Sequence, residues 1–177
     1  MIKKLGLLVT ALVIFGLASC DLNEYTQFDM EFTTSVTVPA SSGITLPFDL
    51  FTPKTTTNAT TTFGNNDTNK ELIQEIILTK MTMDITAPGD RDFDFLEEIR
   101  IFINADGLSE LEIASKTSVP ADVDMITLEV NANDIKEYIK ADKFQLRVKT
   151  ITDEVLNSDV EIEVYTKFAV DAEVLGV

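Results

Sequence analysis

The sequence contains no histidine, no tryptophan and a single cysteine, Cys20, among its 177 residues. Without histidine the chain cannot form a Ser-His-Asp or Cys-His catalytic site, and one cysteine cannot build a Cys/His zinc site. Cations are also scarce, because 14 Lys and Arg residues stand against 30 Asp and Glu residues, a formal net charge of −16. Since nucleic-acid binding needs a basic surface to neutralise phosphates, we expect no nucleic-acid partner.

The N-terminus carries the longest apolar segment of the chain. Lys3 and Lys4 precede a run over residues 5–18 that is broken only by small residues, Gly6, Thr10 and Gly16. At ~1.5 Å per helical residue, those 14 residues would span about 21 Å, short of the ~30 Å hydrocarbon core of a bilayer. A cationic start followed by a short apolar run is typical of a signal peptide, and we predict one over residues 1–19.

The apolar run ends at Leu17-Ala18-Ser19-Cys20. This motif resembles the lipobox of bacterial lipoproteins, in which a small residue precedes a cysteine that is lipidated on sulfur before cleavage. The resemblance implies that Cys20 becomes the first residue of the mature protein, anchored to the membrane by acyl chains such as palmitate. The alternative is an ordinary secreted protein with an idle thiol. After cleavage, 12 cations would face 30 anions, a formal net charge of −18.

The residues after Cys20 bear on which membrane holds the anchor. In the enterobacterial pattern an aspartate in the place of Asp21 retains a lipoprotein in the inner membrane, whereas in Bacteroidota-type lipoproteins acidic residues after the cysteine favour export. Cys20-Asp21-Leu22-Asn23-Glu24 has acids at its second and fifth positions. We therefore expect the outer membrane of the cell envelope.

Beyond a short polar tether at residues 20–27, apolar and polar residues alternate with a period of two, the pattern of half-buried strands. The last strand would reach about 50 Å at ~3.3 Å per residue, so we expect it to bend or to be shared between two sheets. Short strands separated by turns predict an all-β fold, an antiparallel β-sandwich of immunoglobulin-like or jelly-roll-like type over residues 28–177. About eight strands are predicted, at 28–38, 44–50, 76–86, 99–103, 111–113, 126–130, 144–148 and 160–174.

Two segments depart from this alternation. Residues 134–140 place Ile135, Tyr138 and Ile139 on one face at helical spacing, which predicts one short helix capped by Asn133. Residues 52–70 are rich in Thr and Asn and show no periodicity, so we predict a mobile, solvated loop.

Asp90, Asp92 and Asp94 are spaced two residues apart, like the first ligands of a calcium loop. The pattern departs from an EF-hand at Phe95, which replaces the invariant Gly, and at Ile101, which replaces the bidentate Glu. Two interpretations stay open. The aspartates belong to a calcium site of another kind, or they face water because Phe93 and Phe95 point inward. Further ligands for such a site would come from Asp106, Asp122 or Asp124.

Thirty acids also raise the question of a glycoside hydrolase, which needs two carboxyl groups facing each other in a cleft. Most acids fall on outward positions of predicted strands, such as Glu110 with Glu112 and Glu161 with Glu163, which is typical of a solvated face. We therefore expect no enzyme activity and, calcium apart, no cofactor. Sugar-binding platforms favour exposed Trp and Tyr, and here only Tyr165 is predicted on the outward face of a strand.

Taken together, the Cys20 motif, the Thr- and Asp-rich composition and the strand pattern resemble small Bacteroidota-type envelope lipoproteins with one β-sandwich domain. The resemblance implies a non-catalytic structural or interaction module, bound to the membrane through its lipid and to an envelope protein through its surface. The alternative is a module that binds glycan or calcium through the loops at 90–94 and 52–70. No functional residue except Cys20 is carried over from the resemblance.

Overall fold

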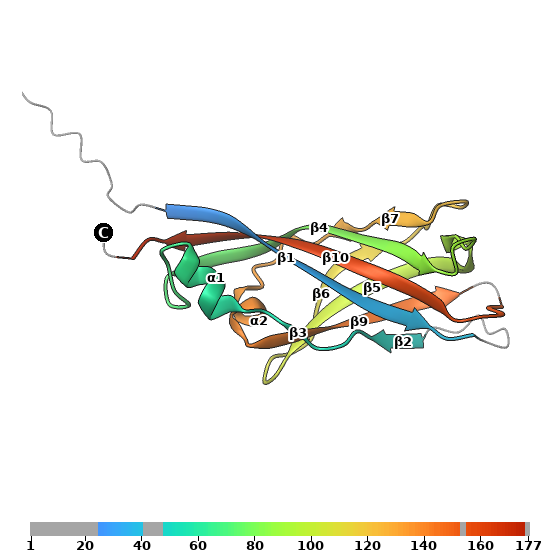
Figure 1. Cartoon of the computed structure of the whole chain (residues 1–177), viewed down its shortest axis with the longest axis horizontal. Coiled ribbons are helices and arrows are strands. Elements are labelled where there is room, and N and C mark those ends of the chain that lie inside the picture. Colours follow the sequence, from blue (N-terminus) through green and yellow to red (C-terminus); the bar gives the residue numbers. More distant parts are fainter. Residues whose placement is uncertain (1–24, 41–47, 153–154, 176–177) are drawn as a thin grey trace, which may run out of the picture.

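The computed structural model describes residues 25–40, 48–152 and 155–175, so the predicted signal peptide, Cys20 and the first part of the strand predicted at 44–50 lie outside the described residues. These residues form two antiparallel sheets stacked face to face (Figure 1). The first strand begins at Tyr25, three residues before the predicted start of the domain.

Both sheets are built from the predicted strands with the addition of β3, and the all-β sandwich is confirmed. A four-stranded sheet has the order β1 (Tyr25–Val38), β10 (Val160–Glu173), β4 (Ile73–Ala87) and β7 (Met125–Thr127). A six-stranded sheet has the order β2 (Phe48–Phe51), β9 (Lys143–Thr152), β5 (Leu96–Ala105), β6 (Leu111–Lys116) and β8 (Glu129–Val130), with β3 (Thr55–Thr56) also paired to β9.

The core lies between the two sheets, where the apolar residues of the alternating strands meet. Phe32, Phe144 and Phe168 pack edge to face, with ring centroids 5.3 to 6.2 Å apart. This geometry is the one that aromatic rings prefer, because the positive ring edge meets the negative ring face. Met81 and Met83 are fully buried and fill the remaining space.

Pairing between β1 and β10 fixes the two ends of the sandwich. Tyr25 pairs with Glu173 at one end, and Val38 pairs with Val160 at the other. Fourteen residues at ~3.3 Å each separate these ends by about 45 Å. We call them the Tyr25 end and the Val38 end.

Of the two expectations for the last strand, a bend or sharing between the sheets, sharing is wrong. Although β10 is long, it stays in the four-stranded sheet, where bulges shift its register against β4 at three places. The shared segment is instead residues 125–130. Its first part, β7, pairs with β4, and its second part, β8, pairs with β6. Leu128 lies between them, and its backbone N–H donates to the Met81 carbonyl at 3.0 Å.

The prediction of a mobile loop at 52–70 is wrong. This segment contains β3 and a second helix, α1 (Ala59–Asn65), whose Phe63 is fully buried and contacts Phe28 at 6.2 Å between ring centroids. Its hydroxyls satisfy backbone groups of distant segments, because Thr57 donates to the Ala141 carbonyl after α2 at 2.6 Å and Thr68 to the Glu173 carbonyl of β10 at 2.6 Å. A segment without periodicity is thus held by one aromatic anchor and by specific hydrogen bonds.

The predicted helix is present as α2 (Lys136–Lys140), but Asn133 does not cap it, because the N-cap position is Ile135. Asp134, rather than Asn133, accepts a hydrogen bond from the backbone N–H of Lys136, at 3.0 Å. The same carboxylate oxygen accepts from the N–H of Ile76 in β4 at 3.1 Å. Burial acts to raise the pKa of Asp134, but the hydrogen bonds from Ile76 and Lys136 outweigh it and hold that pKa below its usual value.

Candidate functional site

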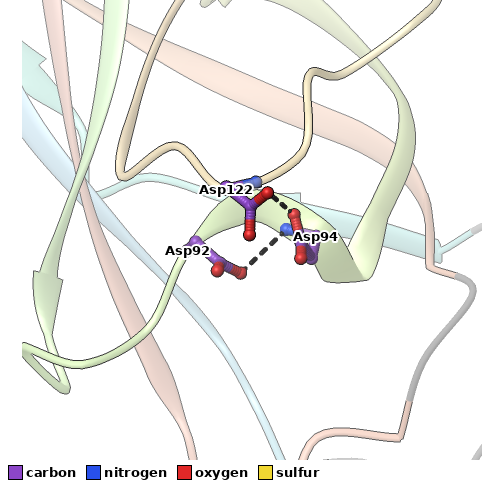
Figure 2. Close-up of side chains that lie close together, drawn as sticks. All are labelled: Asp92, Asp94 and Asp122. Atoms are coloured by element: carbon purple, nitrogen blue, oxygen red, sulfur yellow. Dashed lines mark hydrogen bonds between the residues drawn. The ribbon is translucent and has the colours of Figure 1, made fainter.

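The aspartates singled out from the sequence lie at the Val38 end, between two loops. Asp92, Asp94 and Asp122 each offer a carboxylate oxygen, and these oxygens lie within 4.8 Å of one another (Figure 2). The Asp92 side chain accepts from the N–H of Asp94 at 3.2 Å, and the Asp94 side chain accepts from the N–H of Asp122 at 2.6 Å. We call these three residues the aspartate cluster.

Two buried aromatic residues explain why the chain folds this way. Phe93 and Phe95 belong to a 3-10 turn, η1 (Phe93–Phe95), and their fully buried rings stack at 6.3 Å. Because both rings point inward, the carboxylates of the adjacent Asp92 and Asp94 are left half-buried at the surface. The N–H of Phe93 donates to the Val123 carbonyl at 2.8 Å, which joins the two loops. Asp122 has a φ of 56°, a left-handed conformation that aspartate tolerates better than most residues.

The other aspartates predicted as calcium ligands lie outside the aspartate cluster. Asp90 is exposed and outside the aspartate cluster, and Asp106 forms an ion pair with Lys54 at 2.9 Å. Asp124 is also outside it, with its backbone carbonyl bound to the N–H of Ile85 at 2.9 Å. Calcium takes six to eight oxygen ligands, so the three carboxylates would supply about half and water the rest.

A second cluster lies on the outer side of the six-stranded sheet and was not predicted from the sequence. Arg147 donates to both carboxylate oxygens of Glu110, at 2.7 and 2.6 Å, and forms an ion pair with Asp49. Its guanidinium lies 4.1 Å from the centroid of the Phe102 ring, within the range of a cation–π interaction. We call the outward side chains here the arginine face, consisting of Asp49, Phe51, Glu98, Arg100, Phe102, Glu110, Glu112, Arg147 and Lys149.

The arginine face combines a fixed charge with an exposed aromatic ring. The side chain of Arg147 is only 16% exposed, whereas Phe51, which pairs with it across β2 and β9, is 60% exposed. The hydrogen bonds that Arg147 donates to Glu110 raise the pKa of Arg147 above its usual value, so the group stays charged. One signal in the sequence could have identified this site, namely two arginines and two phenylalanines on outward positions of strands in an acid-rich chain.

The outer side of the four-stranded sheet has a different character. It carries eight acids against Lys80 and Lys167, and we call it the acidic face: Asp29, Glu31, Glu75, Asp84, Glu161, Glu163, Asp171 and Glu173. Lys167 pairs with Asp29 at 2.7 Å, and that hydrogen bond raises the pKa of the lysine. A shallow hollow of about 380 Å³ lies beside Ala169, between Gln27, Asp29, Glu75 and Asp171. The sandwich therefore presents two faces of different charge.

Within the described parts of the chain, no helix is long and apolar enough to cross a membrane. No protein-family model and no curated protein matches the sequence. Among solved structures, a chain from Desmodium yellow mottle tymovirus is similar at a TM-score of 0.33 and 10% identity, over 88% of this chain and 92% of that chain. A TM-score this low does not establish a shared fold.

Proposed function

We propose that this chain is a lipoprotein of the cell envelope, anchored in the outer membrane through acylated Cys20, and that its sandwich is a non-catalytic interaction module. The observation that carries the anchor is the order of Lys3 and Lys4, the apolar run and Leu17-Ala18-Ser19-Cys20. The first strand, β1, begins at Tyr25, so a lipid on Cys20 would be attached five residues ahead of it.

The arginine face supports a role in protein binding. Arginine and large aromatic residues are enriched at the energetically important centres of protein interfaces. Here the Arg147 side chain is held in one orientation by Glu110, Asp49 and Phe102, and Phe51 stands exposed beside it. A partner would thus meet a pre-organised charge and an exposed ring with little loss of side-chain entropy.

Acylation is tested by palmitate labelling of cells that express the full chain. Labelling should be lost in Cys20→Ala, and the protein should keep its signal peptide, because lipidation of the cysteine precedes cleavage. Ser19→Ala is the matched control, because it keeps a small residue before the cysteine and should stay labelled. Retention of label in Cys20→Ala would refute the anchor.

The interaction role is tested by affinity capture of the acylated protein from its own envelope. A partner protein that is captured with the unmodified chain should be lost from the capture with Phe51→Ala. Met125→Ala is the matched control, because Met125 is 55% exposed but lies on β7 of the other sheet. If both variants retain the same proteins in equal amounts, the arginine face is not the interface.

Calcium binding is the second candidate function, favoured by the aspartate cluster. Oxygen atoms from Asp92, Asp94 and Asp122 converge within 4.8 Å, and carboxylate oxygens are the ligands that calcium prefers. One oxygen of Asp92 and one of Asp94 already accept backbone hydrogen bonds, so each residue has a second oxygen for a cation. The titration that tests this candidate is given in the Discussion.

A further inference from the structure

One segment at the Tyr25 end of the sandwich is almost without charge. Residues 55–69, which we call the polar cap, contain seven threonines and four asparagines but only one charged residue, Asp67. The cap is tied to the end of β10, because Leu175 donates its N–H to the Asp67 carbonyl at 2.7 Å and Thr68 donates to the Glu173 carbonyl. Figure 1 shows α1 of the cap beside the start of β1 and the end of β10.

The Val38 end is different. The loop at 88–97 carries Asp90, Asp92, Asp94 and Glu97 against Arg91, and the loop at 117–124 adds Asp122 and Asp124. The polar cap therefore carries one acid, whereas the two loops at the Val38 end carry six acids against one arginine. Close to an anionic lipid surface each charge is worth about 1 kcal/mol, so the Val38 end would be repelled and the polar cap would not.

The length of chain ahead of β1 limits which surface can approach the lipid. Cys20 is five residues before Tyr25, and five extended residues reach at most about 18 Å. The Val38 end is about 45 Å further along β1. Because this connection is so short, the surface around Tyr25 must stay close to the membrane that would hold acylated Cys20. Resting on the acidic face would bring Asp29, Glu31 and their neighbours against the headgroups.

We propose that the polar cap is the surface of the domain that lies against the lipid bilayer. This inference rests on the proposed acylation of Cys20 and adds the orientation of the domain. Threonine hydroxyls and asparagine amides exchange hydrogen bonds with phosphate and ester oxygens without bringing net charge. The arginine face and the aspartate cluster are then left open to partners, the first on the side and the second at the membrane-distal end.

The orientation is tested with the full mature chain, acylated on Cys20, in vesicles of phosphatidylethanolamine and phosphatidylglycerol. Since the only native cysteine is acylated, a second cysteine can be labelled uniquely with a fluorophore. Three exposed positions serve as probes: Thr61→Cys on the polar cap, Asp90→Cys at the Val38 end and Lys149→Cys on the arginine face. Spin-labelled lipid headgroups should quench the Thr61→Cys probe several-fold more strongly than the other two.

Quenching that is equal at all three positions, or strongest at Lys149→Cys or Asp90→Cys, would overturn the orientation. The failure of the anchor gives a different result. In that case mass spectrometry finds no acyl chain on Cys20 and the protein does not float with the vesicles. If the acylated protein floats but the Thr61→Cys probe is not preferentially quenched, the orientation alone is wrong and the anchor stands.

Discussion

Arg147 donates two hydrogen bonds to the Glu110 carboxylate across 37 residues of sequence, at 2.7 and 2.6 Å. The parallel geometry is the one in which a guanidinium binds a carboxylate most strongly. Because Glu110 lies immediately before β6 and Arg147 in β9, the pair bridges over β5. These two hydrogen bonds hold the Arg147 guanidinium in one orientation on the outer side of the sheet.

Removal of this guanidinium should destabilise the domain moderately. We expect Arg147→Ala to lower the free energy of unfolding by about 1–2 kcal/mol, from the loss of the bidentate pair and of the cation–π contact with Phe102. Urea denaturation of the soluble domain measures this change. Lys149→Ala, an exposed position two residues along the same face, is the matched control and should change it by less than about 0.5 kcal/mol. Equal effects would show that the pair does not stabilise the fold.

Phe63 should be required for the stability of the whole domain. The ring is fully buried against Phe28 and comes from the Thr- and Asn-rich segment. We expect Phe63→Ala to cost about 3–5 kcal/mol of unfolding free energy, as in other large-to-small core substitutions. Thr61→Ala, exposed on the same helix, should cost far less. A near-zero effect of Phe63→Ala would mean that α1 is only loosely attached to the sandwich.

The carboxylate of Asp134 should make the free energy of unfolding depend on pH in the acidic range. Its pKa is lower in the folded protein, so its contribution is complete above the ordinary carboxyl pKa and is lost as pH falls through the folded-state value. We expect Asp134→Ala to cost about 1–2 kcal/mol at pH 7, because the N–H groups of Ile76 and Lys136 lose their acceptor. The difference from the unmodified chain should narrow below about pH 4. If the difference in unfolding free energy between Asp134→Ala and the unmodified chain stays constant from pH 7 to pH 3, the ionised carboxylate of Asp134 does not stabilise the fold.

Calcium should bind at the aspartate cluster if the second candidate function holds. Titration of the soluble domain with calcium chloride should then release or absorb heat and raise the melting temperature. Asp94→Asn should abolish both effects, whereas Asp90→Asn should leave them unchanged, because Asp90 is exposed and outside the cluster. If the unmodified domain shows neither heat nor a shift in melting temperature, calcium is excluded as a ligand.

The sequence determined the strands and their inward faces. The alternation of Val160, Ile162 and Val164 with Glu161 and Glu163 placed one set in the core and the other in water, and the structure agrees. Period two works here because successive side chains of a strand point to opposite sides of a sheet. The anchor prediction at Cys20 likewise depends only on local sequence, and it stays a prediction.

Only the tertiary structure decided which distant residues meet. Asp122 joins Asp92 and Asp94 because two buried phenylalanines bring their loop against residues 122–123, and no spacing in the sequence encodes that contact. Arg147 finds Glu110 and Phe102 through the order of strands, and Phe63 turns a segment without periodicity into part of the core. Hydrophobic pattern fixes the side of a strand on which a residue lies, whereas strand order and loop packing fix its neighbours.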